Sequence, residues 1–591
     1  MILGSNSLYS KEKKMKKSIV ILILLGMVIC LAGQEFNSFR YLSTGGALDG
    51  DVEYAFDPLD LSYLKGIRFF TGLSNYSSED QLFKDSSENY LLLGGSTDKT
   101  FITNLKAALL FKYHDTENPL PFDFYADPYD DIYVSTIGQA EYDWQGYIDT
   151  NGNNLYDQYV SYYQEFRNME LDKNSNLSLV LSYPLGENNI LGYKLGYVKD
   201  SSENSYCHQD MLYFDYGDPS YEGIYQMESL PDMDPLVNAY QEDSALTGDF
   251  KQTTDSSTLR NQFAYSHRGE KWELSGYYSL DLGNLDQDSN NEVLYKEHNS
   301  VDSSFLRDEA SSTHKYASDQ MANRLAGRVR YTLVPNEDHA HSGYLAAAIS
   351  VGMISNDGES RMRDYSNQYS PIALERNIYE DIFDIDGDES GLELGLMSRL
   401  NLPLNSSTFF GLGIAYNHMS EKLDGTYDYY TAYLDTTYHA FTGEWVTAQK
   451  EISKSSGDVT GEDYTHIVRV PVGLEYWFTS NAKWAMRFGS VFSHTTTISK
   501  FKYNPTLIEP TLIVEYTPDG IVDSWIEDNT SLKENSSTKT STSDNSFSYG
   551  IGYKANKNLQ IDLLAMFDTD NAELWNTHFL RSLRLAFSIN L

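Results

Sequence analysis

Arginines recur on one face of several short amphipathic segments. In "RLAGRVRYTL" (324–333) and "KWAMRFGSVF" (483–492) the arginines alternate with apolar residues, so each strand would carry a cationic and an apolar face. The candidates for a water-facing wall are Arg260, Arg328, Arg330, Arg399, Arg469 and Arg487. A guanidinium group binds carboxylates through paired hydrogen bonds.

Two kinds of carboxylate partner are available to these arginines. One is an acidic stretch near the start of the chain (Asp49, Asp51 and Glu53), and the other is the acidic side chains on the same strand faces (Glu273, Asp281, Glu475 and Asp562). The arginines could instead attract the anionic head group of a ligand. Structural pairing is the commoner role, and both alternatives stay open.

Two acidic stretches have the spacing of weak calcium sites. Asp149, Asn151, Asn153 and Asp157 occupy the first, third, fifth and ninth positions of a calcium-loop pattern, and Asp384, Asp386 and Asp388 repeat the theme. The twelfth position of the first stretch is Val160, where the pattern requires a bidentate Glu. Turn formation explains the same residues equally well. Ca²⁺ is therefore the one cofactor that the sequence suggests.

Catalytic motifs are missing from the sequence. It contains no Gly-x-Ser-x-Gly, no His-Glu-x-x-His and no glycine-rich phosphate loop. A hydrolase would need Ser493 or His494 beside His466, which the sequence cannot place. We therefore predict no catalytic residues and no enzyme activity.

The elements that carry these residues alternate strictly between apolar and polar positions. The chain ends on "LRLAFSINL" (583–591), with Leu583, Leu585, Phe587, Ile589 and Leu591 on one parity. Roughly sixteen segments of about 9 to 13 residues share this pattern, which is the length that a tilted strand needs to cross a bilayer.

Connection lengths favour a membrane barrel over a soluble β-sandwich. Short turns such as "GENN" (186–189) and "ANKN" (555–558) alternate with long acidic stretches such as 200–256 and 420–461. We predict an all-β fold, a transmembrane antiparallel up-and-down β-barrel of about 14–16 strands over residues 65–591, with short periplasmic turns and long acidic extracellular loops. The last strand should pair with "GIRFFTGL" (66–73) and so close the barrel.

Composition narrows the class of protein further. The 591 residues have a formal net charge of −41 and a mean hydropathy of −0.46. Such a low hydropathy excludes a helical membrane protein, and the acidity excludes a nucleic-acid partner. Of the two cysteines, Cys30 lies in the leader, so no disulfide framework is expected.

The start of the chain resembles an export signal. "MKKSIVILILLGMVICLAG" begins at Met15 with a lysine pair, followed by an apolar run too short to span a bilayer. We expect residues 1–34 to be a cleaved signal peptide, with translation starting at Met15. The expected location is the outer membrane of a diderm, Gram-negative bacterium. The expected partners are outer-membrane lipid and the barrel-assembly machinery, and we expect a monomer.

The segment between this signal and the first strand resembles the opening of FadL-type outer-membrane transport proteins. Gly45, Gly46 and Ala47 match a Gly-Gly-Ala element, and Phe56-Asp57-Pro58 matches an aromatic-x-Pro element. Asp57 stands where that family has Asn, and Leu59-Asp60 stand in place of Ala-Gly. The resemblance implies a plug over residues 35–64, inside a roughly fourteen-stranded barrel that passes hydrophobic compounds. From the residues alone, a compact irregular element or a disordered leader are both open.

Two functions are compatible with these features. The first is a porin-like channel or transporter for small hydrophobic or amphipathic solutes. The second is an adhesin-like surface-interaction protein, in which the barrel anchors long acidic loops that bind a partner, with or without calcium.

Overall fold

The structure is a computed structural model of the chain. It describes residues 36–74, 87–100, 102–119, 121–127, 132–137, 139–148, 158–216, 240–299, 304–336, 341–370, 375–439, 444–478, 483–517, 520–527, 536–556, 558–568 and 584–591. The expected signal peptide and the calcium candidates Asp149, Asn151, Asn153 and Asp157 lie outside these residues. No helix of the described part is long and apolar enough to cross a membrane.

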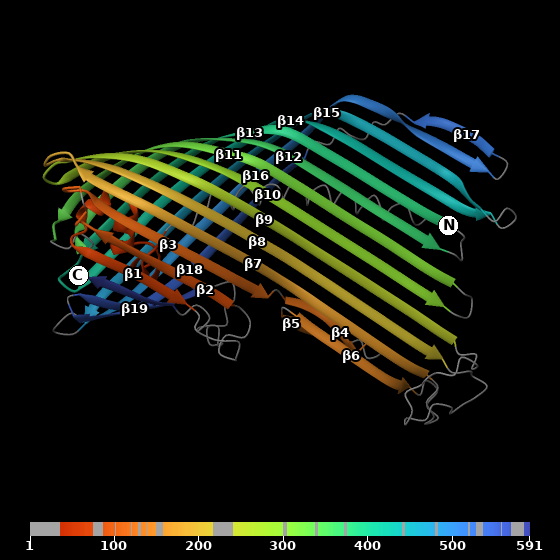
Figure 1. Ribbon diagram of the computed structural model, residues 1–591, viewed down its shortest axis with the longest axis horizontal. Coiled ribbons are helices and arrows are strands. Elements are labelled where there is room, and N and C mark those ends of the chain that lie inside the picture. The colour runs from red at the N-terminus through yellow and green to blue at the C-terminus, as the bar shows by residue number, and fades with distance from the viewer. Residues whose placement is uncertain are drawn as a thin grey trace.

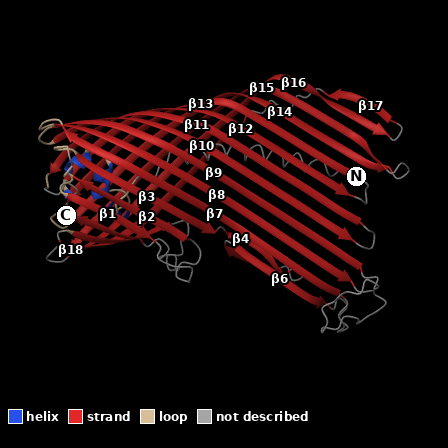
Figure 2. Ribbon diagram, viewed as in Figure 1, coloured by secondary structure: helices blue, strands red, loops and turns tan. Residues whose placement is uncertain are grey.

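Three short helical turns precede a series of antiparallel strands (Figures 1 and 2). The helical turns are α2 (Phe39–Ser43), α3 (Asp51–Phe56) and η1 (Asp60–Tyr63). The first strands are β1 (Ile67–Ser74), β2 (Ser87–Thr97), β3 (Lys106–Pro119), β4 (Pro121–Asp127), β5 (Ile132–Ile137), β6 (Gln139–Ile148), β7 (Gln158–Pro184), β8 (Asn189–Tyr216), β9 (Tyr240–Arg268) and β10 (Trp272–Asn299). They are followed by β11 (Ser304–Val334), β12 (Gly343–Ser370), β13 (Glu375–Pro403), β14 (Thr408–His439), β15 (Glu444–Phe478), β16 (Trp484–Thr517), β17 (Gly520–Glu527), β18 (Ser536–Asn556), β19 (Leu559–Asp568) and β20 (Arg584–Asn590).

Strand pairing closes a ring of 16 strands. Each ring strand pairs with the next, from β1 through β2, β3 and β7 to β16, then through β18 and β19 to β20. The last strand returns to the first, with Phe69 opposite Ile589 and Leu73 opposite Leu585. This pairing confirms the predicted closure. It also confirms the strand number read from the sequence, which exceeds the roughly fourteen that the FadL resemblance implies.

Two strands and one hairpin lie outside the ring. β6 pairs with β7 beyond the end of β3, β17 pairs with β16 beyond the end of β18, and β4 pairs with β5 in a separate hairpin. β6 and β17 therefore continue the two ends of a tall wall formed by β7 to β16, which extends well past the closed ring in Figure 1.

An apolar belt surrounds the end of this wall that is closed into the ring. On β10 the outward-facing side chains from Trp272 to Leu282 are mostly apolar, and those from Asn284 to Glu292 are all polar. On the neighbouring strands the outward-facing side chains also change from apolar to polar near this level. The change runs from Met321 to Asp319 on β11 and from Met353 to Ser355 on β12. Leu325 and Met353 are 64% and 65% exposed. A belt about ten residues high, with large apolar side chains facing outward, matches the hydrocarbon thickness of a bilayer.

Strand length is the main difference from the sequence prediction. Segments expected as long loops, such as 284–299 and 420–439, continue the strands β10 and β14. Above the belt both faces of a strand meet water, so the apolar–polar alternation that reveals a half-buried strand is lost. The Tyr, Thr and Ser residues that remain there are compatible with strands but do not identify them.

Candidate functional site in the barrel lumen

Residues 36–64, which we call the N-terminal segment, form a compact unit. Ser38 caps α2 by accepting a hydrogen bond from the Tyr41 N–H at 3.1 Å. Gly45 and Gly46 adopt the positive φ angles of +60° and +80° after this helix. Glu53 on α3 accepts hydrogen bonds from the Gly50 N–H and the Ser38 hydroxyl, both at 2.7 Å. These contacts fold the segment back on itself.

The N-terminal segment lies inside the ring. Its apolar side chains form a core with inward side chains of β1, β2, β3, β7 and β19, among them Phe70, Leu92 and Leu110. Its remaining contacts reach the other side of the ring, including Tyr277 on β10, Tyr344 on β12 and Glu475 on β15. A short segment can touch opposite sides of a closed ring only from within. The helices at one end of the barrel in Figure 2 show this placement.

Glycines on the wall make room for the segment. Gly411, Gly473, Gly489 and Gly550 lie on β14, β15, β16 and β18, and each faces the backbone or a side chain of residues 43–47. A Cβ added to Gly473 would lie 2.5 Å from the Thr44 carbonyl oxygen, and one on Gly411 would lie 2.6 Å from the Ala47 carbonyl oxygen. Any larger residue at these positions would displace the segment, so wall and segment are complementary in shape.

Asp60 anchors the segment to β11. Its carboxylate accepts bidentate hydrogen bonds from Arg328 at 2.8 and 3.0 Å and from Arg330 at 2.9 and 3.1 Å. Glu273 on β10 lies 3.5 Å from Arg328 and adds a second carboxylate. Burial alone would raise the pKa of Asp60, but the two guanidinium groups outweigh it and hold that pKa well below its usual range.

A second buried ion network joins the segment to β15, β16 and β19. Glu475 accepts hydrogen bonds from Arg40 at 3.0 and 3.1 Å, from Arg487 at 2.7 Å and from the Trp477 indole at 3.1 Å. Arg487 also donates to Asp562 at 2.6 Å. Glu475 and Arg487 are 0% and 1% exposed, so each charge depends on its partners for solvation.

Asp49 makes a third contact with the wall. It accepts a hydrogen bond from the Tyr344 hydroxyl at 2.7 Å and pairs with Arg399. Arg399 also donates to the carbonyl of Gly46. The Gly45-Gly46-Ala47 element is therefore held both by the glycine wall and by a wall arginine.

The aromatic-x-Pro element lies against β8, β10 and β11. The Asp57 carboxylate accepts a hydrogen bond from the Leu59 N–H at 2.8 Å, which forms a local turn, and others from Tyr277 and Arg328, both at 3.1 Å. Pro58 packs over Gly192, because a Cβ added to Gly192 would lie 2.7 Å from the Cβ of Pro58.

The predicted wall arginines have different partners. Arg328, Arg330 and Arg399 bind the N-terminal segment directly, Arg487 binds it through Glu475, and Arg260 pairs with Asp281 at 3.1 Å. Arg469 has no ion pair with any residue that the structure describes. Asp51 pairs with Arg68 on β1, and Glu53 binds within the segment.

The calcium candidates within the described residues lie on a strand rather than in a loop. Asp384, Asp386 and Asp388 alternate along one face of β13, where successive members point the same way about 6.6 Å apart. Within the described ranges, no group of three or more His, Cys, Asp or Glu residues is arranged to hold a metal ion. Calcium binding at Asp149 to Asp157 stays a prediction.

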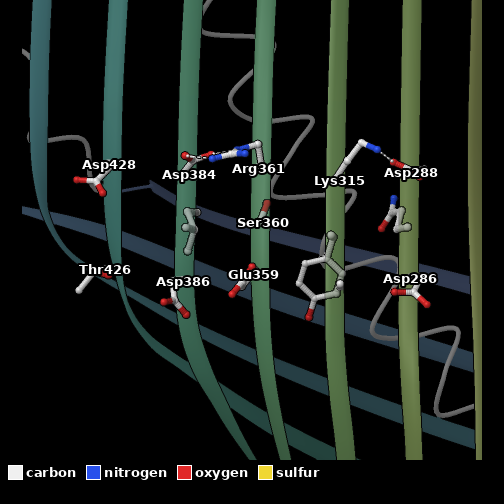
Figure 3. A pocket seen from close by; sticks show the side chains of 14 residues that line it. Asp286, Asp288, Lys315, Glu359, Ser360, Arg361, Asp384, Asp386, Thr426 and Asp428 are labelled. Carbon is white, nitrogen blue, oxygen red and sulfur yellow. Dashed lines mark hydrogen bonds and ion pairs between the residues drawn. The ribbon is translucent and has the colours of Figure 1, made fainter.

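Two of these aspartates line a hollow of about 480 Å³ on the tall wall. Figure 3 shows two ion pairs side by side across β10 to β13, Asp288 with Lys315 at 3.4 Å and Arg361 with Asp384 at 2.9 Å. The pairs are largely exposed, as expected for a solvated outer face.

Sequence reasoning missed the glycine wall and Asp60. Glycine inside a strand pattern usually indicates a bulge or a close approach. Only the strand register shows that Gly411, Gly473 and Gly489 are successive cross-strand partners, with Gly550 one inward position away. Asp60 stands where the family motif has no carboxylate, so the motif gave no reason to select it.

No family model and no curated protein matches the chain. Among solved structures it is similar to the Pseudomonas putida toluene transporter TodX, at 11% identity and a TM-score of 0.31 over 95% of this chain and 99% of that chain. It is also similar to the Ralstonia pickettii toluene transporter TbuX (10%, 0.29, 95% and 100%) and to a mutant of the Pseudomonas aeruginosa ferric enterobactin receptor PfeA (8%, 0.24, 89% and 81%).

Similarities at these TM-scores carry no argument about mechanism. The fold therefore rests on the strand pairing above, and the function on the lumen of this chain.

Proposed function

We propose that the protein is an outer-membrane channel for small hydrophobic or amphipathic solutes, with the N-terminal segment as a plug. The observation that carries the proposal is the contact between this segment and wall residues on all sides of the closed ring. A barrel that served only as an anchor would need no such fitted lumen. The apolar outer belt supports a bilayer location.

The plug would work at the periplasmic end of the lumen. A solute entering from the extracellular side would first pass along the inner surface of the barrel and then reach the segment. Passage requires the segment to shift, and its contacts are apolar packing, local turns and ion pairs rather than strand ladders. Such contacts can be exchanged in steps without opening the barrel.

The proposal is tested by the conductance of purified protein in planar bilayers. Deletion of residues 36–64 should raise the conductance several-fold because the lumen loses its filling. Gly489→Ala keeps the whole chain, but its Cβ would overlap the backbone of Gly45 and Thr44, so we expect a smaller rise.

Gly276→Ala is the matched control, because nothing lies within 4 Å of a Cβ added at that strand glycine. It should conduct like the wild type. Conductance that is equally low for the deletion, Gly489→Ala and the wild type would overturn the proposal.

A second candidate function is surface interaction. It is favoured by four aspartates at one level of the outer face, just above the belt, where Asp319, Asp357, Asp388 and Asp424 are successive cross-strand partners on β11 to β14. Like charges in such a row are unfavourable without a counter-charge. An interaction role would be indifferent to deletion of the N-terminal segment.

A further inference from the structure

Three carboxylates face the lumen above the level of the apolar belt. Glu421 on β14 lies directly opposite Asp463 on β15, and its other cross-strand partner is Gly391 on β13. Glu389 follows one inward position further along β13. A Cβ added to Gly391 would lie 3.1 Å from the Glu421 Cγ, so the Glu421 side chain leans over the glycine toward β13.

None of the three has a cationic partner among the described residues. Glu389 accepts a hydrogen bond from the Asn356 amide at 3.1 Å, and Ser499 hydrogen-bonds Asp463. Only 9% of Glu421 is exposed to solvent. Its carboxylate has no hydrogen-bond partner among the residues that the structure describes.

Other charges near this level are already compensated. Arg324 on β11 pairs with both Glu393 and Asp281, and Arg260 pairs with Asp281. The arginines at the level of the plug are bound to its carboxylates or to Glu475. Arg469, three inward positions nearer the plug than Asp463 on β15, has no ion pair among the described residues, so β13 to β15 carry three carboxylates and one arginine without an ionic partner above the plug.

An aromatic group lies further along β13 and β14 from the carboxylates and on β16, with Tyr427 about 20 Å of extended strand beyond Glu421 and Phe501 nearest to Asp463. It consists of Phe383, Tyr427, Tyr429, Phe501 and Tyr503. The ring centroids of Tyr427 and Tyr503 are 5.2 Å apart, and those of Phe383 and Tyr427 are 5.9 Å apart. Phe501 is the cross-strand partner of Gly461, two residues from Asp463. Aromatic faces beside unpaired carboxylates recognise organic cations, because both attract a positive charge that carries apolar groups.

We propose that the carboxylates Glu389, Glu421 and Asp463, with this aromatic group, form a capture site for amphipathic organic cations. The inference deepens the proposed transport function and rests on it. It assigns the solute a positively charged head, of the ammonium type, attached to an apolar or aromatic body. Anionic amphiphiles are disfavoured because no free cation faces them at this level of the described wall.

The test compares three probes of similar shape on the full-length protein in detergent. Benzyltrimethylammonium carries the positive charge, neopentylbenzene replaces its nitrogen by carbon, and phenylacetate carries a negative charge. We expect isothermal titration to show binding of benzyltrimethylammonium at least tenfold tighter than either of the others.

The variant Glu389→Gln/Glu421→Gln/Asp463→Asn should reduce this preference at least tenfold and leave neopentylbenzene binding unchanged. Asp357→Asn/Asp388→Asn/Asp424→Asn removes the same number of charges from the outer face of β12 to β14 and should keep the preference. If the triple inner variant does not fold, Glu421→Gln alone should weaken cation binding several-fold.

Equal binding of the cation and its carbon isostere by the wild type would overturn the inference, as would an unchanged preference in the inner variants. Failure of the plug proposal appears separately, as an unchanged conductance after deletion of residues 36–64. An open channel without a preference for cations would leave the transport proposal standing and remove only this inference.

Discussion

At the scale of single residues, the contacts between the wall and the N-terminal segment depend on a few buried charges. Glu475 lies between the guanidinium groups of Arg40 and Arg487 and is inaccessible to solvent. Removing one member of such a network leaves an uncompensated charge in a region of low polarity, which costs far more than losing an exposed pair.

Glu475→Gln should therefore weaken the folded barrel strongly. The change leaves Arg40 and Arg487 with one carboxylate fewer, and we expect a loss of about 3–5 kcal/mol. Urea unfolding, followed by heat-modifiable migration on gels, measures this loss. Asp288→Asn breaks the exposed pair with Lys315 and should cost less than about 1 kcal/mol; equal effects of the two changes would contradict the structural role of Glu475.

At the scale of elements, the strands above the belt carry the carboxylates Glu389, Glu421 and Asp463 on their inner face. Their sequences lack the apolar–polar alternation that identifies a strand. The sequence predicted the belt, the ring closure at Leu585 and Phe587, and the inward parity of the arginines, because apolar side chains mark the opposite face. It did not predict that β10 or β14 continues beyond the belt, since nothing there distinguishes one face from the other. The partners of Glu421 follow only from strand register.

The capture site should depend on pH. Burial raises the pKa of Glu421 to about 8, of Glu389 to about 7 and of Asp463 to about 6, and repulsion between the carboxylates adds to the first two. The groups that face Glu421 are Glu389 and Glu393 on β13, Asp463 on β15, Asn356 on β12 and Ser499 on β16, with Arg324 held by Glu393. Raised carboxyl pKa values mean that the charges appear only as pH rises.

Binding of benzyltrimethylammonium, whose charge is independent of pH, should accordingly strengthen between pH 5.5 and 8.5. Without a bound cation, the free energy of unfolding should instead fall as pH rises through the same range. The reason is that the raised pKa values stabilise the folded protein only while these carboxyls are protonated. Titration calorimetry and unfolding at several pH values measure the two trends. A binding constant that does not change with pH in this interval would contradict the raised pKa values.

At the scale of the whole molecule, the wall of β7 to β16 stands far above the bilayer. On β10 the strand continues from Asn284 to Asn299 beyond the apolar belt, which is about 50 Å of extended chain. The residues that make this part acidic are on strands, so the negative potential belongs to a fixed surface rather than to loops.

Cysteine labelling locates the upper limit of the belt. In a Cys207→Ser background, Asp288→Cys on the outer face should react with a membrane-impermeant maleimide on intact cells, because its side chain is 62% exposed to solvent. Leu274→Cys, which lies on the same strand and the same face within the belt, should not react, since lipid covers it. Equal labelling at the two positions would contradict the membrane position assigned to β10.

The seam of the barrel has a consequence for its biogenesis. Seven residue pairs join β1 to β20, from Arg68–Asn590 to Ser74–Arg584, whereas 28 pairs join β10 to β11. The partners at the seam are also the most distant in the chain, so their contact carries the largest loop-closure entropy and forms late. Insertion should therefore end on this short ladder, after the tall wall has formed. The seam is consequently a joint that can stay open until the rest of the ring has formed.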